Sequence, residues 1–337
     1  MPKLVLLRGL PGSGKSTYAQ ELLAKHGNMI RVNRDELREC LHKGLKWTGA
    51  RESATISAEM AIAADALSRK YSVVVDDTNL TENGVAAWKR LAVQCDCVHE
   101  LDSILDADTP ETATKRIRVY FEIKDFTDVP IDECVKRDAL RSGKARVGRG
   151  VIERMALKAC LIDLSKLDKV AIVDVDGTLA CLDHRLHFIQ REPKDYDSFF
   201  GKVSSDMYFH SIVSAVVNLC LRGYKVIIVS GRPASTGYDT NKWLMSAGIP
   251  FEHLFMRNSG DHKPDHEAKE EILQMMFKAG LRKDAIKVVI DDRDSVCDGV
   301  WRKHGLPLIQ VDRGNAIQIH PDALKTCIEI GIPVSCG

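Results

Sequence analysis

Short apolar runs that end at polar or glycine residues mark the predicted strands of this chain. Five such runs stand out, at residues 4–7, 73–75, 170–173, 226–229 and 288–290. Longer stretches with apolar residues at helical spacing lie between them, at residues 53–70, 212–221 and 270–279. Unbroken apolar runs between helices are typical of buried strands in parallel sheets. The pattern therefore predicts an α/β fold.

The runs fall into two groups, and a length of 337 residues favours two domains. We predict domains over residues 1–155 and 165–337, although no proline-, glycine- or serine-rich linker marks a boundary within residues 150–168. Ligands of open α/β sheets bind at the carboxyl ends of strands. Because each predicted strand ends in glycine, carboxylate or hydroxyl groups, we expect one site in each domain.

Composition is that of a folded globular protein, with 45% hydrophobic and 28% charged residues. No apolar run approaches the ~18 residues of a membrane span, and the N-terminus does not read as a signal peptide. We therefore expect a cytoplasmic protein without a membrane segment. A net charge of +1 excludes a generally basic nucleic-acid-coating protein, and ten cysteines without a CxxC pair favour buried, reduced thiols over a zinc site.

The segment from Gly9 to Ser16 matches the phosphate-binding pattern GxxxxGK[ST], between a predicted strand and a helical stretch. Its glycines allow backbone N–H groups to converge on phosphate oxygens at a helix N-terminus. Lys15 would reach the β- and γ-phosphates of ATP, and Ser16 would hold Mg²⁺. The candidate nucleotide-binding residues are Gly12, Ser13, Gly14, Lys15, Ser16 and Thr17.

Asp35 and Arg38 form a candidate acceptor site for a kinase, because residues three apart share one face of a helix. The carboxylate could take the proton of an attacking hydroxyl while the arginine binds a phosphate. An equally favoured alternative is that Asp35 caps the helix, and the two roles are compatible.

A basic run between Cys134 and Gly150 holds six basic residues and one acidic residue. Arg137 and Arg141 are spaced one helical turn apart and could neutralise the charge of a transferred phosphoryl group. The alternative is an ordinary solvated basic face, but a local excess of charge in a nearly neutral chain favours a functional role.

The second predicted site begins at Asp174-Val-Asp176-Gly-Thr178, directly after an apolar strand. Residues two apart in a strand point the same way, so both carboxylates can face one pocket. They would repel each other unless a cation or proton intervened, and Mg²⁺ would also bind a phosphate. Such pairs occur in calcium loops and glycosyltransferases as well, so the pair alone does not specify the chemistry.

Three further motifs make the second site specific. Ser230-Gly-Arg232 ends one strand with groups that bind phosphate, and Asp291-Asp292 ends another with metal ligands. Lys269 opens a helical stretch between them and could neutralise both a nucleophile and a phosphoryl group. The sequence thus predicts attack on phosphorus by one aspartate. The candidate metal ligands are Ser16 in the first domain and Asp174, Asp176, Asp291 and Asp292 in the second.

These motifs resemble the haloacid dehalogenase phosphatase superfamily in the second half, and the whole chain resembles phage-type polynucleotide kinase 3′-phosphatases. The family's kinase half carries GLPGSGK[ST], NRD-x-x-R, DTN and a basic lid, which match residues 9–16, 33–38, 77–79 and 137–141. The resemblance implies a P-loop kinase domain with a parallel sheet, followed by a Rossmann-like haloacid dehalogenase-type phosphatase domain.

For the kinase half, the resemblance implies that Asp35 activates a 5′-hydroxyl and that Arg38 holds the 3′-phosphate of the same nucleotide. Arg137 and Arg141 would lie on the donor phosphates. The resemblance also implies RNA or DNA ends as substrates, a functional link to a ligase, and a homotetramer joined through both domain types.

For the phosphatase half, the resemblance implies that Asp174 becomes an aspartyl-phosphate, with Asp176 as general acid and then base. Arg185 and Arg232 would contact the substrate phosphate, and Asp265, four residues before Lys269, matches a functional acidic position. Residues 186–209 are longer and more aromatic than the compact family form and could cap this site.

We therefore expect a bifunctional end-healing enzyme that phosphorylates 5′-hydroxyl ends and removes 3′-phosphates, or 2′,3′-cyclic phosphates. A small-molecule kinase fused to a metabolite phosphatase would carry the same motifs, although the basic run favours a polyanionic substrate. A non-catalytic module that binds ends and uses ATP as a switch is a further alternative, but binding alone requires no nucleophile.

Overall fold

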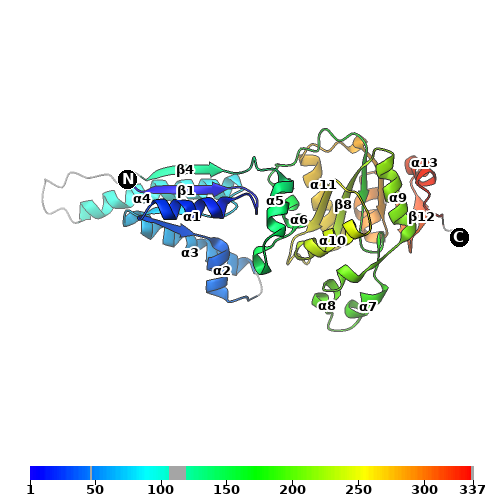
Figure 1. Ribbon diagram of the computed structural model, residues 1–337, viewed down its shortest axis with the longest axis horizontal. Coiled ribbons are helices and arrows are strands. Elements are labelled where there is room, and N and C mark those ends of the chain that lie inside the picture. The colour runs from blue at the N-terminus through cyan, green and yellow to red at the C-terminus, as the bar shows by residue number, and fades with distance from the viewer. Residues whose placement is uncertain (46–47, 106–118, 335–337) are drawn as a thin grey trace. The chain divides into compact units, whose positions relative to one another are not determined.

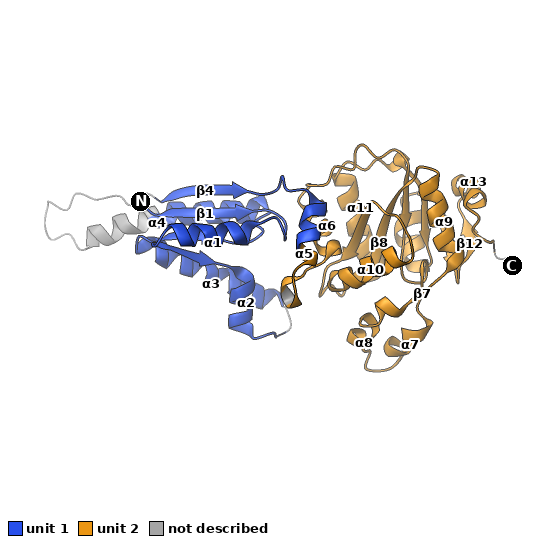
Figure 2. Ribbon diagram, in the orientation of Figure 1, with its two compact units in different colours: residues 1–137 blue, residues 138–337 orange. Residues whose placement is uncertain are grey.

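The computed structural model describes residues 1–45, 48–105 and 119–334. The chain forms two compact units, Met1–Arg137 and Asp138–Gly337, each built around its own sheet (Figures 1 and 2). No helix in the described part of the chain is both long enough and apolar enough to cross a membrane. The eight cysteines that the structure describes form no disulfide; four are buried, whereas Cys40 and Cys160 are exposed.

The first unit contains a four-stranded parallel sheet with the order β2-β3-β1-β4. Its elements are β1 (Lys3–Arg8), α1 (Lys15–Lys25), β2 (Met29–Val32), α2 (Arg34–His42), α3 (Gly49–Ser68), β3 (Ser72–Val75), α4 (Glu82–Leu105), β4 (Tyr120–Asp125) and α5 (Ile131–Ala139), whose last two residues fall in the second unit. The two predicted strands are the central ones, β1 and β3. The sequence does not predict β2 and β4, because both lie at sheet edges and carry charged residues among apolar ones.

The second unit contains a six-stranded sheet with the order β12-β11-β10-β5-β8-β9. Its helices and strands include α6 (Arg149–Lys158), β5 (Val170–Val173), β6 (Ala180–Cys181), α7 (Asp183–Gln190), α8 (Tyr196–Phe200), β7 (Met207–Tyr208), α9 (His210–Leu221), β8 (Lys225–Pro233), α10 (Gly237–Ser246), β9 (His253–Arg257), α11 (Asp265–Lys278), β10 (Ile286–Asp291), α12 (Asp294–Val296), β11 (Leu308–Asp312), β12 (Asn315–Ile319) and α13 (Pro321–Ile330). The three apolar runs of this half are β5, β8 and β10, as predicted. The sheet is mixed rather than wholly parallel, because β12 returns antiparallel to β11.

Apolar packing fixes the strands and so places the loops that follow them. In the first unit, β1 and β3 pack against α3 and against Trp88 of α4. In the second unit, α9 packs on β8 through Ile212, Val216 and Leu219. The phosphate loop therefore begins at the carboxyl end of β1, and Asp174 lies directly after the carboxyl end of β5.

Helix α6 covers the edge strand β9 of the second sheet. Leu254 N donates to Glu153 Oε2 at 2.5 Å, and Arg154 Nη1 donates to Met256 O at 2.8 Å. Both helix side chains are buried. They form hydrogen bonds with backbone groups of β9 that would otherwise be available to a neighbouring strand. Helix α6 thus packs as part of the second unit, whereas the domain boundary between residues 155 and 165 stays a prediction.

We predict that a fragment of residues 138–337 is more stable than a fragment of residues 165–337. The shorter fragment lacks α6, so Leu254 N–H and Met256 O exchange their partners for water. The apolar burial that Ile152 and Leu157 of α6 provide is also lost, at about 1.5–3 kcal/mol for each side chain. Thermal unfolding of the two fragments measures the difference. Equal melting temperatures would show that α6 does not contribute to the fold.

Candidate active sites

The phosphate loop connects β1 to α1 and is shaped by glycine. Gly12 has a φ of +82°, and a Cβ at this position would overlap with Cys134 O of α5. Lys15 is buried beneath the loop, where its Nζ donates to Gly9 O at 3.0 Å and to Leu10 O at 2.7 Å. Two carbonyl oxygens of the loop therefore hold the Lys15 ammonium group. The oxygens of a bound phosphate would be stronger acceptors for the same group.

Ser16 lies opposite a carboxylate that ends the neighbouring strand. Its Oγ donates to Asp76 Oδ1 at 3.2 Å, and Asp76 is buried and held by Arg31 Nε at 2.8 Å. A hydroxyl beside a carboxylate supplies the oxygen ligands that Mg²⁺ prefers. These two residues therefore suit a Mg²⁺ ion that accompanies a nucleotide.

Asp35 and Arg38 lie together on α2, as their spacing predicts. Arg38 Nη1 donates to Asp35 Oδ1 at 2.5 Å, and the Asp35 side chain is 86% exposed. The interpretation of Asp35 as the helix cap is wrong, because Asn33 caps α2 by accepting from the backbone N–H of Glu36. Glu52 of α3, which the sequence analysis does not identify, orients Arg38 through Nε at 2.9 Å and Nη2 at 3.0 Å.

A buried carboxyl pair holds the first turn of α2. Arg34 N donates to Asp77 Oδ1 at 3.0 Å, and Arg34 Nη2 contacts Glu59 Oε2 of α3 at 2.9 Å. Burial, and then the neighbouring Asp77, raise the pKa of Glu59 to about 8. At neutral pH Glu59 therefore retains its proton, beside Asp77 and one guanidinium.

The basic run does not form one helix face. Helix α5 ends at Ala139, so the prediction that Arg137 and Arg141 lie one turn apart on a helix is wrong. The chain turns because Asp138 accepts from the N–H groups of Val147 and Gly148. Arg137 remains close to the phosphate loop, since a Cβ on Gly14 would lie 3.7 Å from its Nη1. Arg141 belongs to the second unit.

In the second unit, Lys269 of α11 lies among carboxylates at the carboxyl ends of β5 and β10. Its Nζ lies 2.8 Å from Asp291 Oδ2 and 3.0 Å from Asp174 Oδ1. Carboxylate oxygens of Asp174, Asp291 and Asp292 lie within 4.8 Å of one another. Burial and the nearby Asp291 raise the pKa of Asp292 to about 6; burial also raises that of Asp174, against the effect of Lys269. Three hard oxygen donors that repel one another suit Mg²⁺.

Gly177 forms the turn that follows Asp176 and allows Asp292 to lie against it. Its φ is +84°, and a Cβ here would overlap with the Asp292 carboxylate. Thr178, the next residue, donates its hydroxyl to Asp292 Oδ1 at 3.2 Å. The glycine and threonine of the motif therefore place Asp292 against the strand that carries Asp174.

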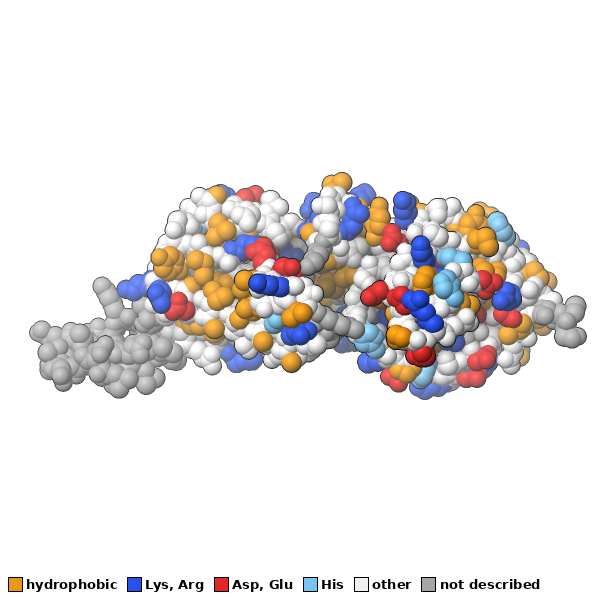
Figure 3. Space-filling view, turned by 90° about the horizontal axis from the view of Figure 1, so that it is seen from below, with side chains coloured by type: hydrophobic (Ala, Val, Ile, Leu, Met, Phe, Trp, Pro, Cys, Tyr) orange, Lys and Arg blue, Asp and Glu red, His pale blue; other side chains and the backbone are white. Residues whose placement is uncertain are grey.

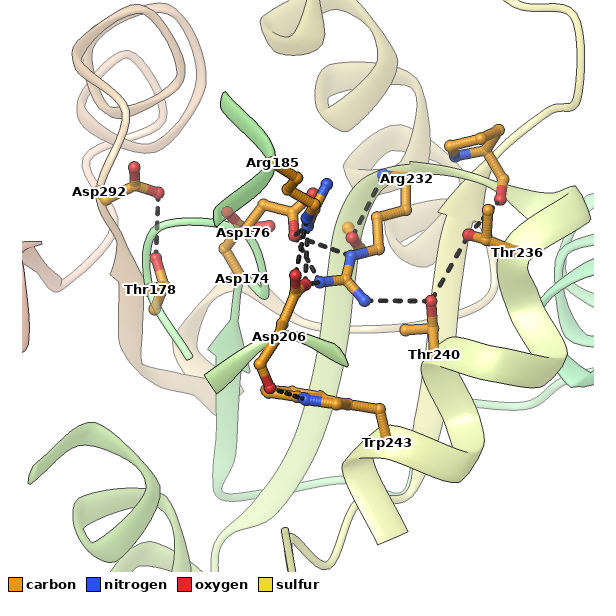
Figure 4. A network of polar contacts seen from close by, with 12 residues as sticks. Asp174, Asp176, Thr178, Arg185, Asp206, Arg232, Thr236, Thr240, Trp243 and Asp292 are labelled. Atoms are coloured by element: carbon orange, nitrogen blue, oxygen red, sulfur yellow. Dashed lines mark hydrogen bonds and ion pairs between the residues drawn. The ribbon is translucent and has the colours of Figure 1, made fainter. Parts of the chain in front are cut away.

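Two arginines share two carboxylates beside the metal-type cluster (Figure 4). Arg185 Nη2 and Arg232 Nη2 lie 2.7 and 2.6 Å from Asp176 Oδ1. The same arginines bind Asp206, which accepts from Arg185 Nε at 2.7 Å and Arg232 Nη2 at 2.5 Å. Burial opposes ionisation of Asp176, but Arg232 and Arg185 outweigh it and lower its pKa. The Asp176 carboxylate lies outside the metal-type cluster, so its role as a metal ligand stays a prediction.

Asp206 is the residue that sequence reasoning misses at this site. It lies in the segment between α8 and β7, outside every recognisable motif, and Trp243 of α10 donates Nε1–H to its backbone oxygen at 2.7 Å. Its burial between two arginines could not be read from local spacing. Arg185 Nη1 is also buried and has no hydrogen-bond partner among the residues that the structure describes, which leaves a donor for an anionic ligand.

Asp265 supports the cluster from the start of α11. It accepts from Arg257 Nη2 at 2.9 Å and lies 3.7 Å from Lys269 Nζ. A Cβ on Gly231 would overlap with its carboxylate, so Asp265 also packs against the turn that carries Arg232. The predicted site residues of this half thus lie close together, and Asp265 contacts the cluster through Lys269.

On the face shown in Figure 3, the basic side chains of each unit are interspersed with acidic and apolar ones. Within each unit, the residues described on that face form no continuous basic band. A polyanion bound to that face would therefore contact local groups of arginine and lysine.

Comparison with known sequences assigns each unit to a family. Residues 4–159 match the AAA domain family, and residues 168–316 match the polynucleotide kinase PNKP phosphatase domain. The chain thus joins an AAA-type P-loop domain to a PNKP-type phosphatase domain. This pairing confirms the expected α/β classes of both halves and the resemblance to polynucleotide kinase–phosphatases.

Individual relatives are distant. A protein of Autographa californica nuclear polyhedrosis virus, described as a bifunctional polynucleotide kinase/RNA ligase, is 23% identical over 330 residues, which are 91% of this chain. The chain spans about two fifths of that relative, 42% of its length. A chain from the structure of a Pnkp1/Rnl/Hen1 complex is 23% identical, with 92% and 96% coverage of the two chains and a TM-score of 0.36.

A further solved structure covers a smaller share of this chain. The Mycobacterium tuberculosis APS kinase CysC is 21% identical over 41% of this chain and 69% of its own, with a TM-score of 0.30. At these TM-scores, structural likeness does not assign a substrate. The PNKP-type phosphatase domain is therefore identified from its sequence family, and its geometry is argued from its own residues.

We expect Glu59→Gln to stabilise the AAA-type domain at pH 8.5 and to have little effect at pH 5. A glutamate has a pKa of about 4.3 in an unfolded chain, so the folded protein binds this proton more tightly. Stability of the wild type therefore falls as pH rises from that value through about 8, whereas glutamine has no proton to lose. Urea unfolding at the two pH values, monitored by hydrogen exchange in α3, measures the difference in stability between the variant and the wild type. An equal effect of the substitution at both pH values would contradict the raised pKa of Glu59.

We expect Asp206→Asn to lower phosphatase turnover by about 10²-fold, because both arginines lose the charge that fixes them and small displacements at a reacting centre are costly. Steady-state assays on a 3′-phosphorylated oligonucleotide measure the loss. Asp239→Asn, which changes an exposed acid of α10, is the matched control and should have no effect. Full activity of Asp206→Asn would contradict the positioning of Arg185 and Arg232.

Proposed function

We propose that this chain repairs nucleic-acid ends by two reactions. The first transfers the γ-phosphate of ATP to a 5′-hydroxyl, and the second removes a 3′-phosphate. The observation that carries the proposal is that the PNKP-type phosphatase domain brings Asp174, Lys269, Asp291 and Asp292 into one buried cluster, in the same chain as a complete phosphate loop.

The AAA-type domain supports in-line phosphoryl transfer. The loop amides and Lys15 would bind the phosphates of ATP, and Ser16 with Asp76 would hold its Mg²⁺. The exposed Asp35 would accept the proton of the 5′-hydroxyl as its oxygen attacks the γ-phosphorus. Arg38, held by Glu52, would bind a phosphate of the same nucleotide. ADP leaves with the former β–γ bridging oxygen.

The phosphatase domain supports a two-step displacement. Asp174 would attack phosphorus and form an aspartyl-phosphate, and the bond from phosphorus to the 3′-oxygen would break. Asp176 would protonate the departing oxygen and then take a proton from the water that hydrolyses the aspartyl-phosphate. Mg²⁺ held by Asp174, Asp291 and Asp292 would neutralise charge on the phosphoryl oxygens.

Substrate binding explains how Asp176 can serve as an acid. Arg232 and Arg185 lower the pKa of Asp176. A phosphate that takes up donors of Arg185 and Arg232 would weaken their hold on Asp176, so its proton affinity would rise when the leaving group needs a proton. The unpaired Arg185 Nη1 is the first such donor.

The names of the relatives support a role in RNA repair. One is described as a bifunctional polynucleotide kinase/RNA ligase, and another belongs to a Pnkp1/Rnl/Hen1 RNA repair complex. We therefore place RNA ends first among the substrates, with DNA ends next, and infer a functional link to a ligase that acts on the product. The homotetramer and the roles of Arg137 and Arg141 remain predictions from the family resemblance.

We expect the two activities to be separable by single substitutions. An oligonucleotide with a 5′-hydroxyl and a 3′-phosphate is incubated with Mg²⁺ and analysed by mass spectrometry, with and without ATP. Lys15→Ala should still remove the 3′-phosphate but add none, whereas Asp174→Asn should add a 5′-phosphate and retain the 3′-phosphate.

Loss of both activities in either folded variant would contradict two independent sites. If the wild type changes neither end but acts on phosphorylated sugars or nucleosides, the chain is a metabolite kinase and phosphatase instead.

A further inference from the structure

The segment between β6 and β7 adds two short helices, α7 and α8, beside the phosphatase site (Figure 1). Most aromatic side chains here lie at or near the surface; Tyr196, for example, is 51% exposed. Phe199 is different, because only 5% of it is exposed. One residue of α8 is therefore turned inward among polar groups.

Phe199 covers the face of a phosphatase-site arginine. The Cζ of Arg185 lies 4.2 Å from the centre of the Phe199 ring, which is within the range of a cation–π contact. The edges of the same guanidinium are held by Asp176 and Asp206. In-plane hydrogen bonds fix where a guanidinium points, whereas a ring against its face limits its tilt and excludes water.

The second arginine of the site has a similar arrangement. Arg232 has its Cζ 5.7 Å from the ring centre of Trp243, and Trp243 also donates to the backbone of Asp206. Each guanidinium is thus flanked by an aromatic side chain from a different helix, α8 for Arg185 and α10 for Arg232. The position of α8 is thereby coupled to Arg185, the arginine that retains a buried donor without a partner.

We propose that Phe199 is a positioning residue of the phosphatase site, which sets Arg185 to bind the substrate phosphate. This inference rests on the proposed phosphatase function. A phenyl ring has no hydrogen-bond donor or acceptor for a phosphate, so Phe199 would act through the Arg185 guanidinium that it contacts. A flat ring is required, because an aliphatic side chain of similar size would fill the space without the attraction to the guanidinium face.

The test compares Phe199→Leu with Phe199→Tyr in the full chain. We expect Phe199→Leu to weaken binding of inorganic phosphate, in the presence of Mg²⁺, by about tenfold, and to lower kcat/KM for 3′-phosphate removal at least as much. Phe199→Tyr keeps the ring and should stay within about threefold of the wild type. Tyr196→Ala, on the exposed side of the same helix, is the matched control.

Calorimetric titration with inorganic phosphate distinguishes positioning from general stability. Lost stability would lower the folded fraction and the melting temperature but leave the phosphate affinity of the folded protein unchanged. The proposal is overturned if Phe199→Leu binds phosphate as tightly as the wild type, or if leucine and tyrosine weaken binding equally. A wild type without oligonucleotide phosphatase activity would refute the proposed function, while phosphate affinity would still decide the role of Phe199.

Discussion

The phosphatase site removes its charges from water and places charges of opposite sign in contact with one another. Lys269 stands between Asp174 and Asp291, and Arg185 and Arg232 stand between Asp176 and Asp206. A buried charge that lost its partner would cost several kcal/mol, so the members of each group depend on one another. The strand ends, the Gly177 turn and the start of α11 all serve to place these groups within contact distance.

The two groups of charges differ in balance, and this difference separates their chemistry. In the metal-type cluster, Asp174, Asp291 and Asp292 face the single ammonium of Lys269, while Asp265 is paired with Arg257; two negative charges therefore remain in the cluster when all are ionised. Around Asp176 and Asp206, two carboxylates face two guanidinium groups and the charge is balanced. A divalent cation suits the first group. A phosphate that arrived at the second group would add negative charge to a balanced site, which would favour protonation of Asp176.

The central strands and the catalytic motifs were predictable from sequence because each depends on neighbours along the chain. Five apolar runs predicted every inner strand except β11, whose short apolar run is interrupted by Gln310, and spacing placed Asp35 beside Arg38. Edge strands such as β4 were not predictable, since partial exposure dilutes their apolar pattern. Asp206, Glu52 and Glu59 act through partners distant in sequence, which no local spacing reveals. For Arg141 the sequence predicted too much regular structure. The spacing of charges favoured a continuous helix, but α5 ends at Ala139 and the Asp138 carboxylate accepts from the N–H groups of Val147 and Gly148.

Helix α6 affects how readily this protein would aggregate with other chains. An open strand at the end of a sheet offers unpaired N–H and C=O groups on which another chain can assemble. At β9, Glu153 and Arg154 already occupy such groups with side chains that cannot themselves extend a sheet. The cover therefore acts as a guard against intermolecular strand addition. Protein cut or rearranged between residues 137 and 165 would expose a template for aggregation even if every active-site residue were intact.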